Sequence, residues 1–175
     1  MRLYDWLIDP SEVWITRQEG RTYATDRYLV VDCSVVTDED LPDVGVWTIK
    51  KTKPATRVDR FDQESAEKLD PKMRLTTAVQ RWTERPDDYH VAAWSDWTMN
   101  ASHRLGCRIG ALGKTPVAVN HAWLSKAERK HRLVGNDPHR HLLISTNGRP
   151  SGVVGLVLPV RLTPSPVHQA IVKGI

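Results

Sequence analysis

The residues best able to do chemistry in this chain are basic and gather between positions 121 and 149. Lys126, Arg129 and Lys130 fall at i, i+3 and i+4, a spacing that places three cations on one side of a helix. The segment holds six Lys or Arg against two acids, an excess equal to the net charge of +4 of the whole chain. Such localised positive charge is typical of a nucleic-acid surface, although a solvated helix face carries it too. We predict contact with DNA phosphates and keep the solvated face as the alternative.

A second basic stripe is expected on a helix that begins near Asp70, a good N-cap residue followed by Pro71 at the first helical position. Apolar residues recur there at i, i+3, i+4 and i+7, namely Leu75, Ala78, Val79 and Trp82. Beside that apolar face lie three further cations, Arg74, Arg81 and Arg85. Two helices with basic stripes strengthen the prediction of a DNA-binding surface.

A cluster of His131, Asp137, His139 and His141 could instead bind a metal ion, because His139 and His141 on a strand would point to one face. The sequence contains no paired-carboxylate pattern, no H-E-x-x-H and no Gly-rich phosphate loop. No Ser or Cys carries a motif that marks a nucleophile. We therefore expect no enzyme, no metal and no cofactor, and a histidine-metal nuclease is the least favoured alternative.

The elements that must position these residues are read from apolar periodicity. A strand at Val117–Val119 leads into a helix of about three turns from Asn120, whose buried face would hold Trp123, Leu124 and Ala127. Two strands should follow, joined by a tight reversal at Asn147-Gly148. Further strands are expected at Val13–Arg17, Thr22–Val36, Val44–Lys50, Tyr89–Trp94, Trp97–Ala101, His103–Ile109, Leu142–Thr146 and Val153–Val160, with turns at Gly110 and Gly113 and a terminal strand or frayed tail over Ala170–Ile175.

This order predicts an α+β fold that nearly repeats a β-α-β-β-β module, divided into residues 1–60, 61–162 and 163–175. The 175 residues can bury a real core, and no run of about eighteen apolar residues could span a membrane. The first residues do not read as a signal peptide. Cys33 and Cys107 stand far apart and are expected to be reduced core thiols of a cytoplasmic protein.

Four short motifs resemble those of the bacterial-type DNA sliding clamp, the β subunit of DNA polymerase III. The stretch 23–29 (YATDRYL) resembles the clamp hairpin motif A-T-D-G-[YFH]-R-L without its Gly, and 100–106 (NASHRLG) is a looser copy. The stretch 119–124 (VNHAWL) is similar to the V-N-x-x-Y-L helix start, and 157–162 (VLPVRL) is similar to the V-M-P-M-R-L ending. The resemblance implies a DNA-clamp-like fold of antiparallel sheets with two or three helices on one side.

The resemblance also implies partners. Clamps hold duplex DNA non-specifically with basic helices and bind peptide tails of polymerases or loaders in an apolar pocket, and so act as processivity factors in DNA replication. Carried over to this chain, the pocket would be formed by His103, Arg104, Leu105, Leu156, Leu158 and Pro159. Of these, Leu105, Leu156 and Leu158 have an equally good interpretation as sheet core.

The chain departs from the clamp pattern in length. Bacterial clamps are about twice as long, and this sequence runs past the Arg-Leu ending, so a closed ring would need a homo-oligomer of more subunits. A shortened version would suit a phage or another mobile element. The main alternative is a clamp-like interaction protein that binds no DNA and blocks replication partners.

Overall fold

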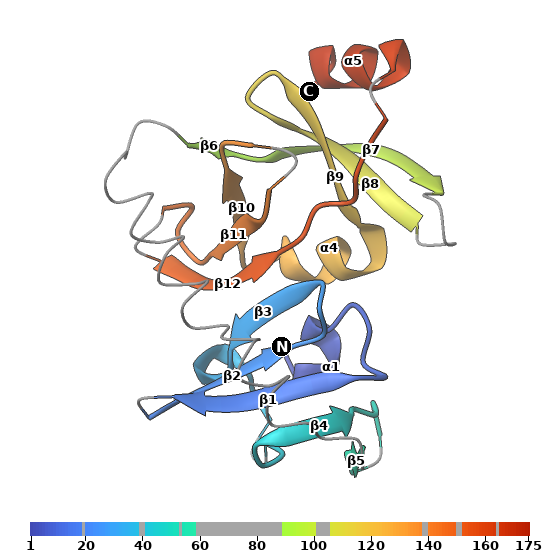
Figure 1. Cartoon of the computed structure of the whole chain (residues 1–175). Helices are drawn as coiled ribbons and strands as arrows, with labels where there is room; N and C mark the ends of the chain where they lie inside the picture. Colours follow the sequence, from blue (N-terminus) through green and yellow to red (C-terminus); the bar gives the residue numbers. More distant parts are fainter. Residues whose placement is uncertain are drawn as a thin grey trace. The chain divides into compact units, whose positions relative to one another are not determined.

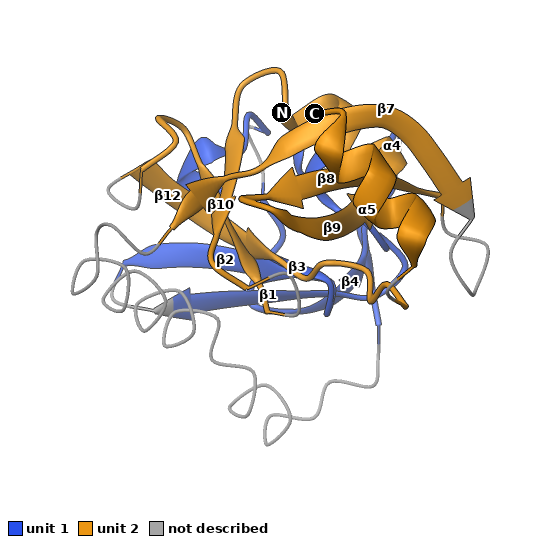
Figure 2. Cartoon of the chain, turned by 90° about the horizontal axis from the view of Figure 1, so that it is seen from above, with its two compact units in different colours: residues 1–78 blue, residues 79–175 orange. Residues whose placement is uncertain are grey.

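The computed structural model describes residues 1–18, 20–38, 41–52, 54–58, 89–100, 106–137, 140–149, 152–163 and 165–175. The chain divides into two compact units, residues 1–78 and 79–175 (Figures 1 and 2). Both are α+β, and the strand pairs described within each unit are antiparallel. None of the described helices is long and apolar enough to cross a membrane.

The first unit is a sheet with the strand order β5-β4-β1-β2-β3. Its buried side chains include Trp6, Val13, Ile15 and Val31, at most 1% exposed. The predicted strand at Val13–Arg17 is confirmed. The elements are α1 (Leu3–Trp6), β1 (Val13–Gln18), β2 (Arg21–Thr25), β3 (Leu29–Asp32), the 3-10 turn η1 (Cys33–Val35), β4 (Gly45–Thr48) and β5 (Thr56–Arg57).

The single strand expected over 22–36 is wrong, because a turn at 26–28 divides it into β2 and β3. The buried Asp26 carboxylate organises this turn by accepting hydrogen bonds from the backbone N–H groups of Tyr28 and Leu29 at 3.0 and 2.9 Å. It also accepts from Ile8 and Asp9, so one side chain joins the turn to the segment after α1. Four backbone N–H groups donate to this carboxylate and stabilise the turn more than β-propensity favours a continuous strand, which explains the break.

The second unit contains two antiparallel sheets, β7-β8-β9 and β12-β11-β10-β6. Its elements are β6 (His90–Val91), β7 (Ala93–Asn100), β8 (Gly106–Leu112), β9 (Thr115–Asn120), α4 (His121–Ala127), β10 (Arg132–Gly135), β11 (Leu142–Ser145), β12 (Val153–Val157) and α5 (Pro166–Lys173). Both helices pack on β8 and β9. Between β9 and β12 the order is β-α-β-β-β; its strand β10 was not anticipated from sequence.

The boundaries around β7 and β8 differ from expectation. The strand predicted at Tyr89–Trp94 is divided at Ala92 into β6 and the start of β7. Strand β7 then continues through the break predicted at 95–96, with a register shift between Trp94 and Thr98. Gly110 is no turn but lies inside β8, where a Cβ atom would come within 2.3 Å of the Ala93 carbonyl oxygen and 2.5 Å of the Trp94 ring. Gly113 is the turn residue, with φ at +61°. Gly110 is therefore required for close approach of β7.

The expected terminal strand or frayed tail is also wrong, since residues 166–173 form helix α5, which lies over β8 and β9 (Figure 2). Ser165 is its N-cap and accepts a hydrogen bond from the His168 N–H group at 3.3 Å, and Pro166 occupies the first turn. Both are standard signals of a helix start. The adjacent Ser165 and Pro166 are therefore the signal in the sequence for this helix.

The predicted helix at 70–85 and the strand start at His103 lie outside the described residues. Cys33 and Cys107 are buried free thiols, as expected. The expected packing of Trp123 in the core is confirmed, since it is 2% exposed, whereas Trp97 is 63% exposed.

Candidate nucleic-acid interface

The end of helix α4 carries the cations that the sequence singled out. The helix begins where the Asn120 side chain accepts a hydrogen bond from the Trp123 N–H group at 2.9 Å, and it buries Trp123, Leu124 and Ala127 as expected. It is shorter than the three turns predicted, ending at Ala127, because the Lys130 and His131 N–H groups both donate to the Ala127 carbonyl and close a turn. Only Lys126 is therefore helical.

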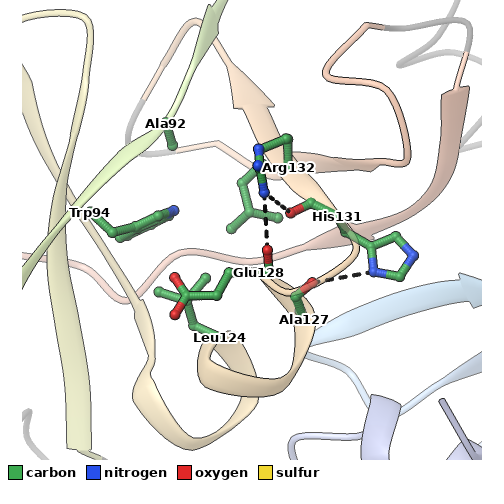
Figure 3. A pocket seen from close by; sticks show the side chains of 8 residues that line it. Ala92, Trp94, Leu124, Ala127, Glu128, His131 and Arg132 are labelled. Carbon is green, nitrogen blue, oxygen red and sulfur yellow. Dashed lines mark hydrogen bonds between the residues drawn. The ribbon is translucent and has the colours of Figure 1, made fainter.

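The turn after α4 nevertheless keeps the cations together. Lys126 on the last helical turn, Arg129 and Lys130 in the turn, and Arg132 at the start of β10 are all exposed. Arg132 Nη1 donates to the carbonyl oxygens of Glu128 and His131 at 3.0 and 3.4 Å (Figure 3). These bonds satisfy carbonyls that the ending helix leaves open and fix one guanidinium. We call Lys126, Arg129, Lys130 and Arg132 the basic turn.

The one acid between Lys126 and Arg132 is Glu128, and it forms an ion pair with a cation of strand β8. Arg108 of β8 places Nη1 2.8 Å from Glu128 Oε1, and the Arg108 side chain is only 14% exposed. The pairing offsets the charge of the Glu128 carboxylate, so that this acid subtracts little from the positive charge of the basic turn. Arg108 stands twenty positions before its partner, and the sequence contained no local signal for the pair.

A small hollow of about 180 Å³ adjoins the basic turn, with Trp94 on one side and Glu128 and Arg132 on the other (Figure 3). His131 also lines it, with Nδ1 3.3 Å from the Ala127 carbonyl oxygen. Burial lowers the pKa of His131, the hydrogen bond to Ala127 opposes the shift, and the nearby charge of Lys130 lowers the pKa further. This lowered pKa favours the neutral form of His131.

The remaining site predictions are placed only in part. The DNA-binding candidates Arg74, Arg81 and Arg85 lie outside the described residues, as do His103, Arg104 and Leu105 of the pocket and His139 of the metal cluster. Within the described part of the chain, no group of three or more His, Cys, Asp or Glu is arranged to hold a metal ion.

The terminal motif of the expected peptide pocket divides between core and surface. Leu156 is 5% exposed in β12, opposite Leu143 of β11, so it is a core residue. The strand ends at Val157, three residues earlier than predicted, and Leu158 beyond it is 50% exposed. Pro159 is half-buried, and the Val160 N–H group donates to the Ala118 carbonyl of β9 at 2.8 Å. Leu158 is thus presented on a segment fixed to the sheet.

Comparisons with protein-family models, with curated proteins and with solved structures gave no match to this chain.

Proposed function

We propose that this chain is a sliding-clamp-like accessory protein of DNA replication that contacts duplex DNA without sequence preference through the basic turn. The observation that carries the proposal is the geometry of that turn: four exposed cations within seven residues, whose only acid is paired with Arg108. Exposed Lys and Arg side chains can reach phosphates, and contacts with phosphates carry no sequence information. Contact of this kind permits movement along the duplex.

The proposed contact has a defined salt dependence. Each phosphate neutralised on a duplex releases counterions and contributes about −0.9 to the slope of log K against log[salt]. Four cations in contact would therefore give a slope of roughly −3.6. The slope measures contacts directly, which makes it more informative than affinity at one salt concentration.

Two features of the fold support the proposal drawn from the resemblance of the sequence motifs to those of clamps. The segment from β9 to β12 has the β-α-β-β-β order of the expected module. In the motif at 23–29, from which the clamp Gly is absent, Arg27 has a φ of +74°, in the left-handed region that favours glycine.

The proposal includes docking of partner peptides of polymerases or loaders. Of the pocket residues that the structure describes, Leu158 is exposed and Pro159 half-buried, so these two are the ones available to a peptide. An exposed apolar side chain on a segment fixed to the sheet can pack against an apolar side chain of a partner.

Fluorescence anisotropy with two unrelated 30-base-pair duplexes over a salt series tests DNA contact. We expect equal affinities for the two sequences and, in the triple variant Lys126→Ala, Arg129→Ala and Lys130→Ala, a slope shallower by about 2.7. A matched triple variant, Arg17→Ala, Lys51→Ala and Lys114→Ala, removes the same charge from exposed positions elsewhere. A wild-type protein without a salt slope, or equal losses in both variants, would contradict DNA contact by the basic turn.

The second candidate is a clamp-like interaction protein that does not bind DNA, and the exposure of Leu158 favours it. The same titration separates the two, because this candidate predicts no salt-dependent binding. Sedimentation at working concentration tests the ring itself, since a monomer cannot encircle a duplex.

A further inference from the structure

A second surface of unit 2 is mainly apolar, in contrast to the basic turn. Helix α5 turns one face, Val167, Ala170, Ile171 and Gly174 at i, i+3, i+4 and i+7, toward a groove of about 760 Å³. Residues 94–97 of β7 form the other wall. Within this groove Trp97, Val167 and Ile175 are 63%, 61% and 46% exposed. Large apolar side chains gathered at one groove mark an interaction surface.

Trp97 is held in its exposed position by a built irregularity of β7. Between the pairs Trp94–Gly110 and Thr98–Arg108, three residues of β7 face a single residue of β8. The extra residues are fixed, because Ser95 Oγ donates to the Ile109 carbonyl at 2.7 Å and accepts from the Trp97 N–H group at 3.1 Å. Arg108 Nε also donates to the Ser95 carbonyl. Bulges of this kind redirect side chains, and here the redirected side chain is Trp97.

The same bulge limits what can bind. In the three-stranded sheet β7 is an edge strand, but a strand added there would meet the interrupted ladder at 95–97. An occupant of the groove must therefore bind by side-chain contact between α5 and the bulge. Nothing in this geometry favours continuous backbone pairing.

The charge of the groove selects the occupant. Of the described residues that line it, Asp96 is the only one with a charged side chain. Its carboxylate is fully exposed and lies 3.5 Å from Arg108 Nη2, a long pairing that leaves oxygen atoms open to a further donor. The last turn of α5 lies at the groove through Ile171 and Gly174 and has the negative end of the helix dipole there, while Lys173 of the same turn is not among the lining residues. A phosphate is disfavoured here and a cation is favoured.

We propose that the groove between α5 and the β7 bulge binds a peptide segment of another protein that carries a large apolar side chain next to a Lys or Arg. The apolar side chain packs between Trp97 and the 167–174 face of α5. The basic side chain reaches Asp96 and can lie over the Trp97 ring, where cation–π attraction adds to the charge pair. The groove is separate from Leu158 and independent of DNA contact.

Selection of a displayed random twelve-residue peptide library on the full-length protein tests the proposal. We expect enriched peptides with an apolar residue adjacent to Lys or Arg, and a loss of at least tenfold in affinity for Trp97→Ser. Tyr28→Ser, a substitution of another exposed aromatic residue, is the matched control and should bind unchanged. Circular dichroism melts of each variant verify that the fold is retained.

Charge reversal gives the sharper test. Asp96→Lys should lose the selected peptides and gain binding when their basic residue is changed to Glu, whereas Asp43→Lys, at an exposed acid outside the groove lining, should do neither. A library that yields no enriched peptide, or peptides that bind Trp97→Ser as well as the wild type, overturns the proposal. Self-association of the wild type that Trp97→Ser abolishes also overturns it, because a second copy would then be the occupant.

Discussion

Replacing Arg108 by Met removes a guanidinium that no other described residue can replace while keeping most of the side-chain volume. Arg108 bonds Glu128 through Nη1, the Ser95 carbonyl through Nε and Asp96 through Nη2. Its side chain is 14% exposed, so the surrounding protein screens these contacts less than bulk water would. The substitution therefore leaves the Ser95 carbonyl and the Glu128 carboxylate without their donor.

The expected cost follows from the exposure of each partner. A hydrogen bond in which one partner is charged contributes roughly 1.5–3 kcal/mol, and the bond from the Arg108 guanidinium to the Ser95 carbonyl is of this kind. Glu128 is 34% exposed, so solvent reduces its share to about 1 kcal/mol. The Asp96 side chain is fully exposed and is left out of the sum. The total loss of unfolding free energy is about 3 kcal/mol. With an m-value near 2 kcal/mol/M, this loss lowers the urea midpoint by about 1.5 M.

Urea unfolding followed by circular dichroism measures this shift, and hydrogen exchange locates it. Protection should fall in β7, β8 and α4 and remain unchanged in β1 to β3. Arg140→Met is the matched control, because Arg140 is 54% exposed and pairs with Asp137 only at i, i+3. It should change stability by less than about 0.5 kcal/mol. Equal midpoint shifts for Arg108→Met and Arg140→Met would refute the reasoning.

Two further substitutions test the fold. Gly110→Ala should lower the free energy of unfolding by about 1–3 kcal/mol, because its Cβ would lie 2.3 Å from the Ala93 carbonyl oxygen. Gly106→Ala in the same strand is the control and should not destabilise, because nothing lies within 4 Å of its Cβ. Thermal melts of the two variants compare their stabilities. Burial, with the Asp32 charge, raises the pKa of Cys33 to about 12, so above pH 9 the unfolded chain loses this proton first and stability falls by up to about 1.4 kcal/mol per pH unit. Urea midpoints between pH 8 and 10.5 should show this slope in the wild type and a flatter one in Cys33→Ala.

Elements whose ends are decided by local chemistry were predictable from the sequence. The Asn120 cap, the buried face of α4 and the positive φ of Gly148, +71°, depend on neighbours within a few residues. The connection around Gly148 is longer than the tight reversal expected, because β11 ends at Ser145 and β12 begins at Val153. Strand β10 was not predictable from the sequence, because Arg132–Gly135 contains only two apolar residues between a cation and a glycine. Its extended conformation is imposed by pairing with β11 and β6, which lie elsewhere in the sequence.

The same distinction applies to the candidate site. The spacing of Lys126, Arg129 and Lys130 indicated a shared surface, and the structure brings them together even though the helix ends before Arg129. The exposed position of Trp97 was not predictable, because it depends on hydrogen bonds between Ser95 and β8. A sequence of alternating apolar residues does not show where a strand bulges.

Arg108 belongs to both surfaces, and this gives the two proposals a common test. Its Nη1 holds Glu128 beside the basic turn, while Nε and Nη2 hold the bulge that presents Trp97. Loss of the guanidinium releases a carboxylate next to the cations and loosens the groove wall at once. Arg108→Met should therefore weaken both duplex binding and peptide binding, whereas the basic-turn variant affects only the first and Trp97→Ser only the second. If Arg108→Met retains both activities at a temperature where it is folded, neither surface depends on this residue.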